Sequence, residues 1–186
     1  MSIKKPIRRE LFYNSDEQEI IKSIKENKIL IYPTDTIYGL GCNALNHGAV
    51  EKIRKIKKRD LKPFSIIAPS IKWIKDNFII DVSLKKYFPG PYTVILKKKN
   101  FEFMKWVSIL DTLGIRIPAH PFTKVIQKSK LPFITTSLNI SGQPHITNPK
   151  NISEEIKNKV DIIIDQGILS GKPSTLVING KEITRS

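Results

Sequence analysis

Polar side chains that could bind an anion gather in four segments of the sequence, each at the end of a predicted strand or helix. The ends of strands are the usual place for ligand sites in open α/β sheets. Hydroxyl and amide side chains fill most of residues 135–142, which is more than a turn requires, and such donors could hold a carboxylate or a phosphate. The four segments are 33–41, 57–59, 135–142 and 171–175, the last together with Arg185.

Two of these segments, taken alone, have an ordinary structural interpretation. The Thr- and Asp-rich segment 34–41 is typical of a loop that leads into a helix. Lys57 and Arg59 at the end of a helix are typical of a solvated cationic end, which the helix dipole stabilises. The sequence contains no Walker A loop and no G-x-G-x-x-G after a strand, so phosphate-loop and dinucleotide folds lose support.

The elements that must position these segments mix helix and strand along the whole chain. Hydrophobic spacing predicts helices over about 15–27, 49–57, 70–77, 83–88, 121–128 and 153–158, and strands over 29–32, 64–68, 92–96, 113–117, 133–136, 160–164 and 176–178. The lysine run 97–99 is predicted to be a solvated turn. No repeat or linker interrupts the chain, so we expect one α/β domain over 1–186, with a twisted, open, mixed sheet flanked by helices.

Length and composition exclude several classes of protein. A chain of 186 residues has the size of one domain. Its apolar runs, such as 162–164, fall far short of the roughly 20 residues of a membrane span, and no signal peptide is evident. A single cysteine, Cys42, suits a reducing compartment and is expected to be a small buried apolar residue. We therefore expect a cytoplasmic protein without a membrane partner.

The net charge of +15 implies anionic partners. Most of the basic residues are Lys rather than Arg, and a surplus of Lys and Ile can also reflect the base composition of a genome. Proteins that read bases depend on bidentate Arg, and the sequence has no basic stripe interleaved with aromatic residues. Specific reading of nucleic acid is disfavoured, whereas binding of nucleotides or non-specific binding of RNA stays open.

Six short motifs occur in order between about Lys28 and Arg185. They are P-T-D-T-I-Y-G-L-G (33–41), K-x-R (57–59), F-P-G-P-Y-T (88–93), G-I-R-I-P-x-H-P (114–121), T-S-x-N-x-S-G (136–142) and P-S-T-L-V (173–177). In this order they make the chain resemble the YrdC/YciO family, which includes the threonylcarbamoyl-AMP synthases. The short length resembles the single-domain YrdC branch and its YrdC-like fold.

The resemblance implies a nucleotidyltransferase that condenses L-threonine, bicarbonate and ATP into L-threonylcarbamoyladenylate and pyrophosphate. This reaction is the first step toward N6-threonylcarbamoyladenosine (t6A) in tRNA, so a downstream threonylcarbamoyltransferase complex is an implied partner. Mg2+ would enter with ATP, and no metal held tightly by protein ligands is expected. Negative charge that grows on the phosphates would be stabilised by Lys, Arg and hydroxyl donors.

The resemblance also implies roles for individual residues. The catalytic K-x-R and S-x-N pairs, which in the family surround the phosphates and the reacting carbamate, are Lys57, Arg59, Ser137 and Asn139. The positions matched to threonine binding are Thr36, Arg116, Thr135 and Ser174. Those matched to nucleotide binding are Arg59, Lys62, Thr112, Ser137, His145 and Arg185.

Two stretches depart from the family pattern. The usual G-R-P-x-x-N-P-L appears as residues 58–64, one residue shorter, which affects the contact assigned to Lys62. A histidine that some relatives place shortly afterwards is replaced by Ile66 and Ile67. The contact of that histidine with threonine must be absent here or supplied elsewhere.

Three other functions compete with the synthase. The chain could bind double-stranded RNA or tRNA by charge and shape without catalysis, although intact K-x-R and S-x-N pairs disfavour this. It could be a YciO-like paralogue without the synthase activity, which analogy of fold does not exclude. The carbamoyltransferases of hydrogenase maturation carry a similar domain, but in much longer chains that contain zinc fingers.

Overall fold

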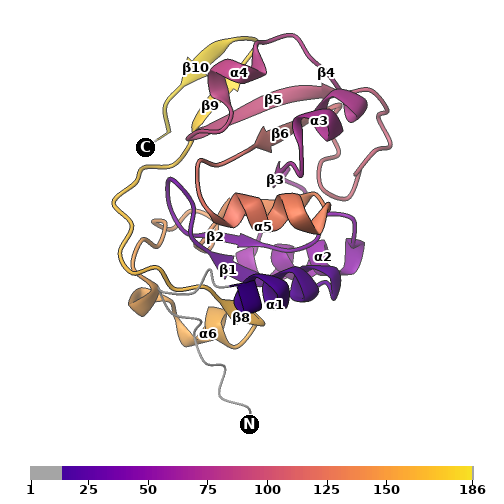
Figure 1. The fold of residues 1–186 in the computed structure, drawn as a ribbon. Coiled ribbons are helices and arrows are strands. Elements are labelled where there is room, and N and C mark those ends of the chain that lie inside the picture. Colours follow the sequence, from indigo (N-terminus) through magenta and orange to yellow (C-terminus); the bar gives the residue numbers. More distant parts are fainter. Residues whose placement is uncertain (1–13, 186) are drawn as a thin grey trace.

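The structure, a computed structural model, describes residues 14–185, and its central feature in that range is a sheet of ten strands (Figure 1). The strands follow the order β10-β9-β5-β6-β3-β7-β2-β1-β8, and β4 pairs with β5 beside this path. The pairs β1–β8, β3–β6 and β5–β9 are parallel, whereas the others are antiparallel. The strands are β1 (Leu30–Tyr32), β2 (Gly39–Gly41), β3 (Ser65–Ile67), β4 (Phe78–Ile79), β5 (Tyr92–Lys98), β6 (Thr112–Arg116), β7 (Phe133–Ser137), β8 (Ile162–Ile163), β9 (Thr175–Ile178) and β10 (Lys181–Ile183).

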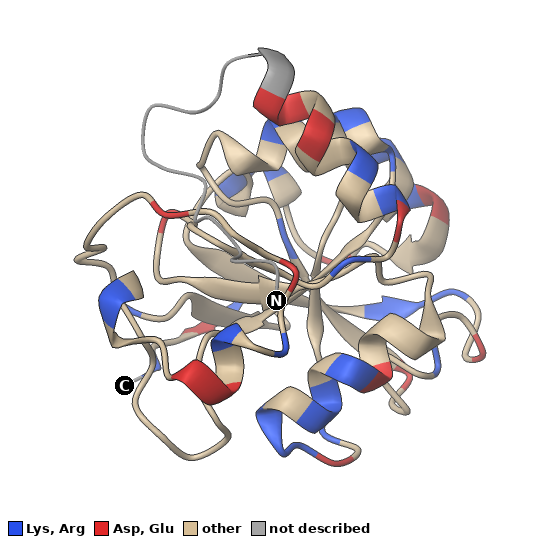
Figure 2. Cartoon of the chain, turned by 90° about the horizontal axis from the view of Figure 1, so that it is seen from below, with Lys and Arg blue, Asp and Glu red and all other residues tan. Residues whose placement is uncertain are grey.

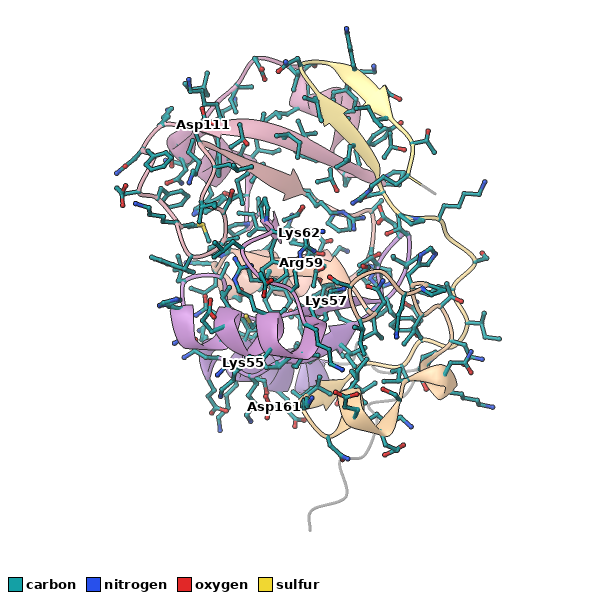
Figure 3. The ribbon with its side chains drawn as sticks, turned by 180° about the vertical axis from the view of Figure 1, so that it is seen from behind. Lys55, Lys57, Arg59, Lys62, Asp111 and Asp161 are labelled. Carbon is teal, nitrogen blue, oxygen red and sulfur yellow. The ribbon has the colours of Figure 1, made fainter. Side chains whose placement is uncertain are left out.

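Helices cover both faces of the sheet. Helices α1 and α5 pack together on one face and α2 lies on the other (Figures 1 and 3). The alternation of side chains along each strand supplies both cores: Leu30 and Tyr32 pack toward α1 and α5, and Ile31 packs toward α2. The helices are α1 (Asn14–Lys25), α2 (His47–Lys57), α3 (Ile71–Asn77), α4 (Leu84–Tyr87), α5 (Phe122–Ser129) and α6 (Glu154–Lys157), with a 3-10 turn at Pro149–Asn151.

The predicted fold class, a mixed α/β sheet flanked by helices, is confirmed. Cys42 is fully buried in the core, as expected. Within residues 14–185 no helix has the length and apolar character needed to cross a bilayer. That one domain spans all of residues 1–186 stays a prediction.

The prediction of a loop over 34–41 is wrong at its end, because residues 39–41 form β2 in the interior of the sheet. Glycine-rich sequence is typical of a turn, but here the glycines allow close packing. A Cβ atom on Gly41 would overlap the carbonyl oxygen of Ile134, and one on Gly39 would overlap the ring of Tyr32. The short strands β4 and β10 were not predicted.

The lysine run 97–99 is not a solvated turn, which corrects the prediction. Both Lys97 and Lys98 belong to β5, and Lys98 is only 4% exposed. The Lys98 Nζ atom donates to the carbonyl oxygens of Phe101 (2.9 Å) and Ser108 (3.1 Å). Burial lowers the pKa of this amine. The connection from β5 to β6 therefore folds around a buried cation.

We expect Lys98→Met to lower the free energy of unfolding by about 2 kcal/mol, because it leaves two backbone carbonyls without their donor. Lys97→Met is the matched control: its side chain is 61% exposed, and its loss should change stability by no more than about 0.5 kcal/mol. Urea denaturation of both variants measures the difference. Equal stabilities would show that water replaces the amine at no cost.

Candidate functional site

A cavity of about 290 Å³ opens in the middle of the sheet, with walls from β2, β3, β5, β6 and β7 and from the segment before β9. Three arginines from separate segments line it: Arg59 follows α2, Arg116 ends β6 and Arg185 follows β10. The lining contains no Asp and no Glu. The other predicted site residues in the lining are Thr135, Ser137, Asn139, His145 and Ser174.

Arg116 lines the cavity and is held by hydrogen bonds from one of its terminal nitrogens. It is 7% exposed, and its Nη2 atom donates to Asp35 Oδ1 (3.0 Å) and Thr36 Oγ1 (3.2 Å). Asp35 is itself fixed, because its Oδ2 accepts from the Ala119 N–H at 2.8 Å. Burial lowers the pKa of Arg116 and the charge of Asp35 opposes this effect. The buried Nε atom of Arg116 has no partner within residues 14–185.

Ser174 joins the segment before β9 to two other parts of the cavity. Its hydroxyl lies 2.7 Å from Thr93 Oγ1 on β5. Arg185 Nε donates to the Ser174 carbonyl oxygen at 2.8 Å, and Arg185 Nη2 donates to the Ser174 hydroxyl. Burial lowers the pKa of Arg185, and the charges of Arg116 and Arg59 lower it further. The charges of all three guanidinium groups therefore meet around the same cavity.

Arg59 reaches the cavity because the chain turns sharply at the end of α2. The C-cap residue Lys58 has left-handed backbone angles (φ 47°, ψ 49°), which end the helix. Arg59 Nη2 donates to the Pro63 carbonyl oxygen (2.6 Å), and its Nη1 lies 3.4 Å from Thr136 Oγ1. Burial and then the charge of Arg54 lower the pKa of Arg59. Its Nε atom is buried and has no partner in the described chain.

Lys57 lies behind the cavity wall and does not line it. The side chain comes from the last turn of α2 and the residue is 2% exposed (Figure 3). Its Nζ atom donates to the Ser137 carbonyl oxygen (2.5 Å) and to Asn139 Oδ1 (2.5 Å), and it lies 3.4 Å from Ser137 Oγ. Burial, and then the charge of Arg59, lower the pKa of Lys57 to about 7.

The turn after β7 is fixed by its own polar groups. Ser137 Oγ donates to Asn139 Oδ1 at 2.7 Å, and Asn139 Nδ2 donates to the Gln143 carbonyl oxygen at 2.5 Å. The Ser141 N–H donates to the Lys57 carbonyl oxygen at 3.1 Å, so α2 and this turn are tied through main chain as well as side chain. Both Ser137 and Asn139 line the cavity.

Besides Lys57, three predicted residues do not line the cavity. Thr36 lies behind Arg116 and bonds to it. Lys62 is exposed, and its carbonyl oxygen accepts from Arg54 Nη1 at 3.0 Å. Thr112 begins β6, at the opposite end of the strand from Arg116, and pairs with Lys97. Spacing along the chain did not distinguish the two ends of this strand.

Several lining residues were missed by the sequence analysis. Thr34 and Thr93 lie inside quoted motifs, so a signal existed for both, as it did for Asp35 beside Arg116. Ser65 had no signal, because it is an isolated hydroxyl at the start of a buried strand. The adjacent Ile66 and Ile67 are both fully buried in β3. The histidine of some relatives therefore has no substitute at these two positions.

Three guanidiniums and several hydroxyls around a cavity without carboxylates make this an α/β protein whose cavity is suited to anions. The particular family follows from sequence comparison. A family model described as telomere recombination, for Sua5, YciO and YrdC proteins, matches residues 22–186. The chain belongs to this family.

Individual relatives agree with this assignment. A Methanocaldococcus jannaschii protein is 38% identical over 188 residues, which cover 95% of this chain and 89% of that protein. Relatives at 32–38% identity carry the name threonylcarbamoyl-AMP synthase.

Two solved structures share the fold. Pyrococcus abyssi Sua5 complexed with L-threonine superposes with a TM-score of 0.83 at 31% identity and covers 95% of this chain, which spans 54% of that longer chain. Escherichia coli YciO superposes with a TM-score of 0.80 at 25% identity, over 96% of this chain and 90% of its own.

We expect Asp35→Asn to lower the free energy of unfolding by about 3 kcal/mol, because it removes the carboxylate that compensates the buried Arg116 while an acceptor for the Ala119 N–H remains. Asp76→Asn, at the exposed pair with Lys72, is the control and should cost no more than about 0.5 kcal/mol. Chemical denaturation compares the two. A small loss at Asp35 would mean that water already compensates the guanidinium.

Proposed function

We propose that this chain is a threonylcarbamoyl-AMP synthase, which condenses L-threonine, bicarbonate and ATP into L-threonylcarbamoyladenylate and pyrophosphate. The observation that carries the proposal is the set of Arg59, Arg116 and Arg185 around one cavity whose lining has no carboxylate. An amino acid and a nucleoside triphosphate together supply the negative charge that such a cavity needs. The names of the relatives support the same reaction.

The cavity divides naturally between the two larger substrates. Arg116, a guanidinium in the cavity lining, is suited to the threonine carboxylate, and Thr135 and Ser174 lie in the same lining. Arg59, Ser137 and Asn139 are suited to the phosphates, with His145 and Arg185 toward the rest of the nucleotide. As the carbamate oxygen attacks the α-phosphate, charge moves onto the leaving pyrophosphate, and fixed donors stabilise it without reorganising.

Mg2+ belongs in this proposal as the companion of ATP. In residues 14–185 no three His, Cys, Asp or Glu side chains are grouped so that they could hold a metal, and the cavity lining offers hydroxyl and amide oxygens only. The lining also holds the imidazole of His145, and a set with no carboxylate fits a cation that the phosphates hold. When bound, Mg2+ would add positive charge beside the leaving pyrophosphate.

A YciO-like paralogue without this activity is less favoured. The fold alone does not separate the two, because Sua5 and YciO structures superpose almost equally well. A function limited to RNA binding is also less favoured, because Lys and Arg lie on many separate elements rather than on one stripe (Figure 2). As a synthase, the protein would act in the cytoplasm and pass its product to a threonylcarbamoyltransferase complex.

We expect the purified protein, given Mg2+, bicarbonate and ATP, to release pyrophosphate only after L-threonine is added. Serine should replace threonine better than alanine does, because a site that bonds the β-hydroxyl loses roughly 1–3 kcal/mol when its partner is missing. A coupled pyrophosphate assay measures both. Equal release with and without threonine would contradict the synthase and favour the YciO-like alternative.

We expect Arg59→Ala to lower turnover by about 100-fold or more, because the lost charge acts mainly on the transition state. Lys55→Ala is the matched control, since Lys55 is an exposed cation on the same helix and its removal should leave turnover unchanged (Figure 3). Circular dichroism checks that both variants are folded. Wild-type turnover in a folded Arg59→Ala protein would show that this arginine is not part of the site.

A further inference from the structure

Lys57, unlike Arg54, Lys58 and Arg116, has no carboxylate partner within residues 14–185. Arg54 is paired with Glu51 at 3.3 Å, Lys58 with Glu155 at 3.9 Å and Arg116 with Asp35 at 3.0 Å. No ion pair within residues 14–185 includes Lys57, whose Nζ atom contacts three oxygen atoms of Ser137 and Asn139. A buried ammonium without a counter-charge is weakly stabilised.

The groups that face Lys57 are neutral or positive. Ser137 and Asn139, from β7 and the turn after it, carry no charge. Arg59, from the loop after α2, acts on Lys57 as a like charge, and Arg54 acts in the same way on Arg59. Glu155 of α6 contacts Lys58 and Lys159 instead. Burial, and then the charge of Arg59, lower the pKa of Lys57 to about 7, so both protonation states are accessible near neutral pH.

The three contacts of the Lys57 amine suit either protonation state. The Ser137 carbonyl oxygen and Asn139 Oδ1 can only accept, so they take two N–H donors in both states. Ser137 Oγ can accept or donate. With an ammonium it accepts the third N–H, while its own proton goes to Asn139 Oδ1 at 2.7 Å; with a neutral amine it can donate to the lone pair instead. The charge of Lys57 thus sets the direction of the Ser137 hydroxyl proton.

We propose that Lys57 is a positioning residue for the phosphate chain: it never touches the nucleotide, and it takes up one proton from solution when the polyphosphate binds in front of Ser137 and Asn139. The inference rests on the proposed function, which places the phosphates there. The anion supplies the missing negative charge one side chain away from Nζ and favours the ammonium. The ammonium no longer accepts a hydrogen bond from the Ser137 hydroxyl. The hydroxyl is then free to donate to Asn139 or to a phosphate oxygen.

The test is the number of protons taken up on binding, obtained from calorimetric titration of ATP without threonine in two buffers of different ionisation enthalpy. A group with a pKa of about 7 is largely neutral at pH 8, so wild-type protein should take up close to one proton there and little at pH 6. The affinity for ATP should weaken by up to about tenfold per pH unit above pH 7.

Variants separate Lys57 from other sources of protons. Lys57→Met should remove the uptake at pH 8, and Lys55→Met, at an exposed position of the same helix, should retain it. Lys57→Arg keeps a permanent charge, so this variant should bind ATP without proton uptake at any pH. It replaces Lys57→Met in the test if Lys57→Met does not fold. Uptake that persists in a folded Lys57→Arg or Lys57→Met protein would overturn the proposal, and so would its absence in wild type.

The outcome is distinguishable from that of the proposed function. Proton uptake with ATP that depends on Lys57, in a protein that releases no pyrophosphate with threonine, would support the role of Lys57 and overturn the synthase. Threonine-dependent pyrophosphate release without proton uptake would support the synthase and overturn the role of Lys57. Failure to bind ATP at all would overturn both.

Discussion

The convergence of three guanidinium groups on one cavity without carboxylates is the constraint on which the site depends. Like charges in a partly buried space repel one another, and each loses solvation. The protein offsets the repulsion and the lost solvation with hydrogen bonds from each arginine to oxygen atoms. Arg116 donates to Asp35 and Thr36, Arg185 donates to Ser174, and Arg59 donates to Pro63. The buried Nε atoms of Arg116 and Arg59 have no partner in the described chain, and both side chains line the cavity.

Helix α2 organises the Arg59 side of the cavity through buried cations that bind backbone carbonyls. The Arg54 guanidinium donates to the carbonyl oxygens of Asp60, Lys62 and Trp106, and it lies 4.6 Å from the centre of the Phe64 ring. It therefore shapes the loop that carries Arg59, while Lys57, three residues later on the same helix, fixes the turn after β7. One helix face thus sets two walls of the cavity.

Glycines in the sheet make room for these side chains. A Cβ atom on Gly114 would overlap Ser65 Oγ, which lines the cavity from the neighbouring strand. A Cβ atom on Gly171 would overlap the backbone of Thr36, so the segment that leads to Ser174 can lie directly on the loop after β1. The cavity therefore depends on glycines, which leave room for neighbouring atoms, as well as on the side chains that line it.

The sequence by itself determined the fold class and most helices and strands, because hydrophobic periodicity and turn residues act locally. Its polar clusters marked the segments that carry Arg59, Ser137, Asn139 and Ser174, whereas the segment of Arg116 came from the family resemblance. Only the tertiary structure decided which face or end of an element each residue occupies. It placed Thr112 at the far end of β6, buried Lys98, moved Lys57 behind the wall and made a strand of 39–41. The hydrogen-bond partner of Lys57 on β7 is 80 residues away, and spacing along the chain does not encode such a contact.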